Sequence, residues 1–434
     1  MSVETKRPSI FANRDFRLLF GGSTISALGD QFTLVALPWL VLKLTGDAAA
    51  LGLVLAAMAL PRALFMFIGG AVVDRMSPRR VLLASRTVNA ILIGILAVLV
   101  LGGAIQMWMV YAIALGIGLA TAFAYPAGSA ILPQLVEPQQ LRASNAVFMS
   151  MRQLSMFVGP ALAGLVISFG AHRVVATQAV SDASGMGLAF SIDALSFLFS
   201  LGSLLMVRIH SDYHPPKPVG GVLADVASGI RAIWSDVSLR AFILYAAVVS
   251  VFVAGPIQVG LPVLADTRLD WGAASLGALM TANGGGVVVG SVLSGLGTKL
   301  ARGHIGIMVL CVDTCVGVAI VALTLVHSTL VGAGLLGTVG LLAGIAQIAV
   351  FTWVQQRVSQ AMMGRTMSVL MFTFMGLGPI SAAVSGALLK VISLSALFGG
   401  AGIILSVFAL LCLISPQMRS IGYSQPLAAQ AASK

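Results

Sequence analysis

Six ionisable side chains lie inside long apolar stretches of the sequence: Asp30, Arg62, Arg86, Arg152, Asp193 and Asp313. A charge at the centre of a membrane helix costs roughly 2.5 to 3.5 kcal/mol, so each group should be paired or face a water-filled space. A buried carboxylate near a guanidinium can take up a proton, and can release it when a conformational change separates the two groups or hydrates the acid. These residue types therefore point to proton transfer.

Asp30 and Arg62 are the strongest candidates for this chemistry. Asp30 lies about 12 residues from the start of the first apolar segment, and Arg62 lies about 12 residues before Asp74, at the end of the second. At about 1.5 Å per residue both reach the same depth, which predicts an Asp30–Arg62 pair. The pair would be either a proton-coupling site or a fixed salt bridge between two helices.

The remaining charges have weaker interpretations. Asp193 and Asp313 are further proton-coupling candidates, but we expect them nearer the ends of their helices, where they would reach water or cap a helix. Arg152 is either a counter-charge or a contact for an anion. Arg86 is expected at the basic rim on the cytoplasmic side.

The segments that must position these residues are long enough to cross a membrane. The chain has 434 residues, of which 58% are hydrophobic and 9% charged, whereas roughly 25% of residues are charged in soluble domains. A membrane helix needs about 20 mostly apolar residues. Twelve such stretches cover 18–42, 48–73, 81–102, 107–132, 144–169, 186–207, 240–264, 273–297, 304–326, 329–353, 366–389 and 396–415. The sequence predicts an all-α membrane protein with twelve transmembrane helices.

These helices are expected to form two six-helix bundles, residues 1–207 and 240–434. The cytoplasmic linker between them, 208–239, is the longest hydrophilic stretch and contains a short amphipathic segment, Val222 to Trp234. Leu37-Pro38 in the first half is echoed by Leu261-Pro262 in the second. Two parallel repeats place a substrate site near the membrane midplane, between the halves.

Lys and Arg residues set the expected orientation. With the N-terminus inside, cytoplasmic segments hold 18 of the 25 basic residues, and external loops hold four. Both termini are therefore predicted to be cytoplasmic. The net charge of +11 then reflects the basic residues that keep loops on the cytoplasmic side, so it does not indicate a nucleic-acid partner.

Small residues and a proline mark places where helices should bend or pack closely. The fifth span contains Gly159, Pro160 and Gly164. Proline removes a backbone donor and bends a helix, while small residues let a neighbouring helix approach. The eighth span contains glycines that predict close backbone packing: Gly284, Gly285, Gly286, Gly290 and Gly295.

A short charged loop after the second span carries the most specific motif, formed by Gly70, Asp74, Arg75, Arg79 and Arg80. It resembles the signature loop of the major facilitator superfamily, and it departs from that signature at Ser77, where the family usually has glycine. The resemblance implies a gating role, in which Asp74 interacts with the N-terminus of the eleventh helix. A simple retention signal made of the three arginines would leave Gly70 and Asp74 unexplained.

Other motifs narrow the resemblance. The Gly159-Pro160 region is similar to a pattern of the family's antiporters, which goes with exporters. Together with stretches of the first half, it resembles the macrolide-efflux and enterobactin-exporter branch; the stretches are Asn13 to Arg17, Leu28 to Phe32, Leu37 to Trp39, Leu60 to Arg62, Tyr125-Pro126 and Leu141 to Ala146.

The resemblance implies that substrate contacts come from helices 1, 4, 7 and 10. Aromatic and amide side chains of suitable depth fit an amphipathic ligand, because rings bury apolar area and amides fix orientation. For each of these residues, simple packing is the competing explanation. The candidates are Gln31, Phe123, Tyr125, Arg152, Phe252, Gln258 and Gln347.

The expected function is secondary active transport, namely export of a small amphipathic organic compound, drug-like or a siderophore, by alternating access in exchange for protons. The protein would be a monomer in a bacterial inner membrane, without metal or cofactor. Flipping of a lysophospholipid on the same fold remains an alternative. A membrane enzyme or a channel is disfavoured, because no catalytic constellation, phosphate-binding loop or selectivity filter is visible.

Overall fold

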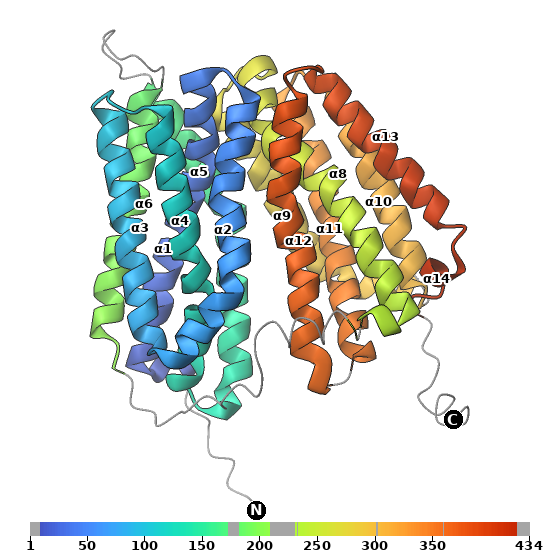
Figure 1. Cartoon of the computed structure of the whole chain (residues 1–434), viewed down its shortest axis with the longest axis horizontal. Coiled ribbons are helices and arrows are strands. Elements are labelled where there is room, and N and C mark those ends of the chain that lie inside the picture. The colour runs from blue at the N-terminus through green and yellow to red at the C-terminus, as the bar shows by residue number, and fades with distance from the viewer. Residues whose placement is uncertain are drawn as a thin grey trace, which may run out of the picture. The chain divides into compact units, whose positions relative to one another are not determined.

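The computed structural model describes residues 9–171, 182–208, 231, 233–300, 303–358 and 360–422, without the side chains of 66–72, 74, 75, 171, 296, 298–300, 360, 361, 364, 365, 368 and 375. Long helices joined by short loops make up this part of the chain (Figure 1). They are α1 (Arg14–Thr45), α2 (Ala48–Arg75), α3 (Pro78–Leu101), α4 (Met107–Ile131), α5 (Leu141–Ala171), α6 (Ala183–Met206), α8 (Val237–Arg268), α9 (Ala273–Leu300), α10 (Ile305–Ala322), α11 (Thr329–Arg357), α12 (Gln360–Leu388), α13 (Leu394–Cys412) and α14 (Pro416–Arg419).

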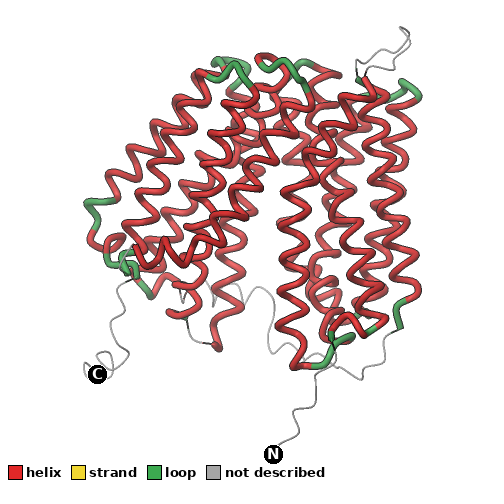
Figure 2. The backbone as a smooth tube through the Cα atoms, turned by 180° about the vertical axis from the view of Figure 1, so that it is seen from behind, coloured by secondary structure: helices red, strands yellow, loops and turns green. Residues whose placement is uncertain are grey.

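Twelve of these helices are long and apolar enough to cross a membrane, and all the regular structure in the described ranges is helical (Figure 2). The predicted all-α class and number of spans are confirmed. Helices are the expected solution, because lipid offers no partner for backbone N–H and C=O groups.

Polar residues outside the apolar segments fix where helices begin and end. The side chain of Asn13 accepts hydrogen bonds from the backbone N–H groups of Asp15 (2.9 Å) and Phe16 (3.1 Å), which caps α1. At its other end Gly46 adopts a φ of 63°, in the left-handed region that glycine enters without strain. These signals set the bounds of α1 beyond the apolar stretch that predicted it.

The chain divides into two compact units. The first comprises residues 1–46 and 54–219, and the second comprises residues 47–53 and 220–434. The main boundary lies between residues 219 and 220, and the predicted linker bounds, 208–239, stay a prediction. Most of that linker, including the greater part of the amphipathic segment that begins at Val222, lies outside the described residues.

Three helix contacts of the first unit recur between the corresponding helices of the second. In the first unit α1 packs against α5 and α6, and α3 packs against α6. In the second unit α8 packs against α12 and α13, and α10 packs against α13. The internal repeat that the sequence motifs indicate is thus also a repeat of helix contacts.

Each unit has its own buried aromatic core. Phe16 of α1 meets Phe148 of α5 edge-to-face, with ring centroids 5.9 Å apart, inside one buried cluster. Phe242 of α8 meets Trp353 of α11 in the same manner at 5.6 Å, inside another. The early turns of the first helix of each unit are anchored in this way.

Glycines close the contact between α9 and α11. A side chain at Gly286 would collide with the carbonyl oxygen of Gly337, and one at Gly290 with that of Leu341. The approach is reciprocal, because α11 also has glycines that face α9. A Cβ at Gly340 would collide with the carbonyl oxygen of Asn283, and a Cβ at Gly344 would collide with that of Val287. The predicted close packing of the eighth span is confirmed at Gly286 and Gly290, whereas a Cβ at Gly295 would meet nothing within 4 Å.

Candidate functional site

Asp30 lies near the middle of α1, and its side chain keeps accessible surface. The positive charges that act on it most strongly are those of Arg152 on α5, Arg86 on α3 and Arg62 on α2, in that order. A carboxylate that faced hydrocarbon would be costly, so we expect this accessible surface to face water and not lipid. Four helices of the first unit therefore bring one acid and three bases together.

The expected direct pair between Asp30 and Arg62 is not formed. Within the described ranges, neither side chain takes part in a hydrogen bond or in an ion pair within 4 Å, and the two charges act on each other through space. Equal depth was predicted from residue counting, but depth does not fix the direction in which a side chain leaves its helix. The charges of Tyr125 and Arg152 also act on Arg62.

Arg152 lies over the ring of Tyr125, with its guanidinium carbon 4.9 Å from the ring centroid. Both residues are exposed. A cation over an aromatic face is stabilised by the ring quadrupole, and the guanidinium keeps N–H donors for other partners. Arg152 and Tyr125 thus add a stacking surface and hydrogen-bond donors beside Asp30.

Arg86 is not at a basic rim, as the sequence had suggested, but is only 7% exposed. Its Nη1 donates to the backbone carbonyl of Ser200 at 3.0 Å, and its Nη2 donates to the hydroxyl of Ser23 at 2.9 Å. Buried cations are tolerated when their donors are satisfied. Arg86 therefore ties α3 to α6 and α1.

Asp193 is not near the end of its helix, contrary to the expectation from the predicted span. It is the eleventh of the 24 residues of α6 and is 0% exposed. The hydroxyl of Thr33 on α1 donates to its Oδ2, and Ser196 Oγ lies 3.3 Å from its Oδ1. The carboxyl group is therefore enclosed between α6 and α1, where it cannot snorkel to water.

Asp313 also lies in mid-helix, at the ninth of the 18 residues of α10. The hydroxyl of Tyr245 on α8 donates to its Oδ2 at 2.6 Å. Tyr245 is 3% exposed and stacks on Phe408 of α13. The helix-end expectation is wrong here too, and the second unit holds a half-buried carboxyl that accepts from a buried tyrosine hydroxyl.

The substrate-cavity candidates divide by exposure. Gln258 on α8 and Gln347 on α11 are exposed, as are Tyr125 and Arg152, whereas Gln31 and Phe252 are half-buried. Phe123 packs against the buried cluster of the first unit, which favours the packing explanation for it.

The predicted kink places Gly159 against Gln31. A Cβ at Gly159 would overlap the side chain of Gln31 on α1. In the second unit Gly378 of α12 lies beside Gln258 of α8, but less tightly, since a Cβ there would be 3.5 Å from Nε2, an ordinary contact distance. Pro160 lies inside α5 and is buried, as is Gly164. The glycine before proline thus makes room for a glutamine in the first unit, and a glycine before proline contacts a glutamine in the second.

The residues of the predicted gating loop lie at two helix ends: Gly70, Asp74 and Arg75 are in the last turns of α2, which ends at Arg75, and Arg79 and Arg80 are in the first turn of α3, which begins at Pro78. Arg79 donates to the carbonyl oxygens of Leu204 (3.4 Å) and Leu205 (2.8 Å), so it caps the C-terminus of α6, where a cation is favourable. Arg80 is exposed. The structure does not describe the side chains of Asp74 and Arg75 or the exposure of Gly70.

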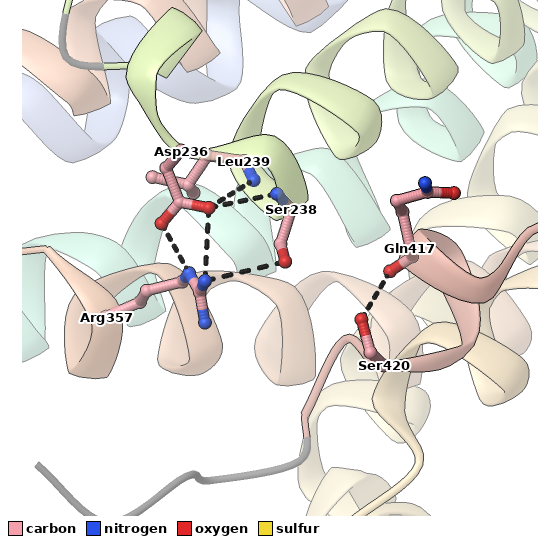
Figure 3. A network of polar contacts seen from close by, with 6 residues as sticks. All are labelled: Asp236, Ser238, Leu239, Arg357, Gln417 and Ser420. Carbon is pink, nitrogen blue, oxygen red and sulfur yellow. Dashed lines mark hydrogen bonds and ion pairs between the residues drawn. The ribbon is translucent and has the colours of Figure 1, made fainter. Parts of the chain in front are cut away.

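A charged contact at the start of α8 was missed by sequence reasoning. Asp236 accepts from the backbone N–H groups of Ser238 (2.9 Å) and Leu239 (3.2 Å), and it pairs with Arg357 at the end of α11 through Nε at 2.6 Å (Figure 3). Burial alone would raise the pKa of Asp236, but the hydrogen bond and charge of Arg357, with the backbone donors, hold it below its usual value. An aspartate just before an apolar run is the signal of such a cap.

Metal chemistry finds no support in the described ranges, where no group of three or more His, Cys, Asp or Glu side chains could hold an ion. Cys311, Cys315 and Cys412 are free thiols.

The comparison with known families decides the classification. A family profile described as Major Facilitator Superfamily matches residues 19–383. The chain belongs to the major facilitator superfamily. The sequence-based resemblance is confirmed, and the chain is a multi-pass membrane transporter.

Similar proteins extend this assignment. The chain is 24% identical over 417 residues to multidrug efflux pump Tap of Mycobacterium tuberculosis, covering 94% of each chain. It is 24% identical over 351 residues to enterobactin exporter EntS of Escherichia coli, covering 81% of this chain and 79% of that one. Macrolide efflux protein A of Streptococcus pyogenes is 26% identical over 153 residues, 35% of this chain and 38% of that one. The crystal structure of nucleoside transporter NupG shares the fold, with a TM-score of 0.68 at 14% identity, and covers 94% of this chain and 100% of NupG.

Proposed function

We propose that this transporter exports a small amphipathic organic compound, a drug-like molecule or a siderophore, from the cytoplasm by alternating access in exchange for protons. The relatives support the class of substrate, because their names describe pumps for drugs, macrolides and enterobactin. The observation that carries the proton part is Asp30, an accessible carboxyl in mid-helix among three guanidinium groups.

Substrate and proton would meet at the same cluster. The ring of Tyr125 offers apolar area, and Arg152 and Arg62 offer hydrogen-bond donors that no described residue takes up. A ligand seated there that donates a hydrogen bond or carries a positive charge toward Asp30 favours the ionised carboxyl, so it competes with the proton. That competition is the coupling free energy between substrate and proton that exchange requires.

The charge distribution supports the expected setting. With 18 of 25 basic residues on one side, both termini would be cytoplasmic, in a bacterial inner membrane. Each unit buries its own core, which is consistent with function as a monomer.

Transport into inside-out vesicles tests the proposal. Erythromycin, enterobactin and ethidium serve as probes, each with and without an imposed pH gradient. We expect saturable, gradient-dependent uptake of at least one probe, and Asp30→Asn should reduce it to the level of vesicles that lack the protein. Asp270→Asn, which neutralises an exposed carboxylate in the loop between α8 and α9, is the matched control and should transport normally.

Two outcomes would contradict the proposal. Uptake that Asp30→Asn leaves unchanged at every pH would remove Asp30 from the mechanism. Absence of gradient-driven uptake of all three probes, with normal amounts of protein in the membrane, would exclude the proposed substrate class.

A further inference from the structure

The most enclosed carboxyl of the first unit is Asp193. Its side chain has no accessible surface, and it presses against α1 at a glycine, since a Cβ at Gly29 would overlap its Oδ1 and the hydroxyl of Ser196. Its side-chain contacts in the described ranges are two hydroxyl groups, those of Thr33 and Ser196. Water therefore has no room at this carboxyl in the present conformation.

The hydrogen-bond geometry around Oδ1 indicates which group carries the proton. Ser196 has one hydroxyl hydrogen, and its Oγ lies 2.7 Å from the backbone carbonyl oxygen of Asp193 but 3.3 Å from Oδ1. An O–H···O bond is usually about 2.5 to 3.0 Å long, so the hydroxyl hydrogen belongs to the carbonyl. An ionised Oδ1 would then be left without a full donor. A neutral carboxyl carries no charge that needs a donor at Oδ1, and Thr33 still donates to Oδ2.

Among the described side chains, none that is positively charged forms an ion pair or a hydrogen bond with Asp193. On α3, Arg86 directs its donors to Ser200 and Ser23. On α5, Arg152 acts on Asp30. The charged group that acts on Asp193 is Asp30 on α1, which has the same sign. An ionised carboxylate without a counter-charge is strongly disfavoured in an enclosed site, whereas a neutral acid is not.

We propose that Asp193 is a second proton-binding site, which carries its proton in this conformation and releases it when α1 and α6 part at Thr33. The release step rests on the proposed function, because it requires the helix movements of a transport cycle. Asp30 and Asp193 then form a coupled pair of acids, one open to water and one occluded. Since like charges oppose each other, ionisation of one disfavours ionisation of the other, and the two titrate as a unit.

Infrared difference spectroscopy of purified protein in lipid nanodiscs tests the proposal without any substrate. A protonated carboxyl absorbs at a C=O frequency separate from that of a carboxylate. We expect the Asp193→Asn protein to lack one protonated carboxyl band at neutral pH. In the spectrum of wild type minus Asp193→Asn, that band should appear as one positive band. Asp313 contributes equally to both samples and cancels.

Thr33→Val supplies a second measurement, the frequency of the Asp193 carboxyl band. If Asp193 had only a structural role and carried no proton, this substitution would not shift that band. It removes the donor to Oδ2 at nearly constant volume, so the Asp193 carboxyl band should shift to higher frequency and remain present. Thr24→Val is the matched control, because Thr24 lies on the same helix and bonds to the carbonyl of Phe20, within α1. That substitution should leave the band in place.

The outcomes separate this inference from the proposed function. Two spectroscopic results would overturn the inference, even if Asp30→Asn abolishes gradient-driven uptake. The first is that Asp193→Asn loses carboxylate bands and no protonated carboxyl band. The second is that Thr33→Val leaves the protonated carboxyl band at its wild-type frequency. A protonated Asp193 band in a protein whose uptake ignores the pH gradient would support the protonation state and contradict the proton-coupled function and the release step that rests on it.

Discussion

Asp236 at the start of α8 combines a helix cap with an ion pair, and substitution can separate the two contributions. Asp236→Ala removes the acceptor for Ser238 and Leu239, which are 2.9 and 3.2 Å away; loss of an N-cap costs about 1 kcal/mol. It also removes the pair with Arg357, whose side chains are 34% (Arg357) and 26% (Asp236) exposed; at that exposure a pair contributes about 0.5 to 1 kcal/mol. The expected total is about 2 kcal/mol.

Asp236→Asn should cost less, because the amide oxygen still accepts from the helix and only the charge is lost. We expect about 0.5 to 1 kcal/mol. Thermal unfolding in lipid nanodiscs, followed by tryptophan fluorescence, measures both variants, and each 1 kcal/mol should lower the midpoint by about 2 to 4 °C for a unit of this size. Asp270→Asn is the exposed-carboxylate control and should not change the midpoint.

Acidification supplies an independent check. The pKa of Asp236 is lowered in the folded state, so its contribution is present above the unfolded value, about 3.9, and is lost as the pH falls through the folded-state pKa. The difference in midpoint between wild type and Asp236→Asn should therefore be constant near neutral pH and shrink below about pH 4.

A double-mutant cycle with Arg357→Gln can refute this reasoning. If the pair is real, Arg357→Gln should destabilise the wild type by more than it destabilises Asp236→Asn. Equal effects in both backgrounds would show that the bond at 2.6 Å contributes nothing, and an Asp236→Asn midpoint as low as that of Asp236→Ala would show that the cap does not matter.

Two further substitutions test the packing of the first unit by the same melting assay. Gly118→Ala should destabilise by about 1 to 3 kcal/mol, because its Cβ would collide with the carbonyl oxygen of Met58; Gly128→Ala on the same helix meets nothing within 4 Å and should melt like wild type. Arg86→Met should cost about 1 to 3 kcal/mol, because the carbonyl of Ser200 and the hydroxyl of Ser23 each lose a hydrogen bond from a charged donor. Arg80→Met is its control, because Arg80 is exposed and lies on the same helix as Arg86. Equal melting midpoints for the two arginine variants would contradict the role assigned to Arg86.

The sequence predicts the helices well because apolar length alone decides what can cross a bilayer. It also predicts that Asp30 and Arg62 share a region of the first unit, since residue counting fixes depth. It does not predict their separation, because the direction of a side chain depends on how each helix is rotated against its neighbours. For the same reason the sequence identifies Arg152 and Tyr125 as two separate candidates but does not predict that the guanidinium lies over the ring.

Asp193 and Asp313 were misplaced for another reason. Their spans were located by hydropathy, which says little about where a helix ends or what lies opposite a polar residue. The partner of Asp193 is Thr33, 160 residues earlier in the chain, and the partner of Asp313 is Tyr245, 68 residues earlier. Such pairings arise from tertiary packing, so a single sequence reveals the acid but not the hydroxyl that holds it.

The reciprocal glycines between α9 and α11 have a mechanical consequence. At Gly286, Gly290, Gly340 and Gly344 an α-hydrogen points toward a carbonyl oxygen of the opposite helix, the arrangement of a Cα–H···O contact. Each such contact contributes about 0.5 to 1 kcal/mol, and lipid tails provide no substitute for it. All four are lost together if the helices part, so α9 and α11 should move as a single rigid body. Conformational change within the second unit is then confined to its other helix contacts.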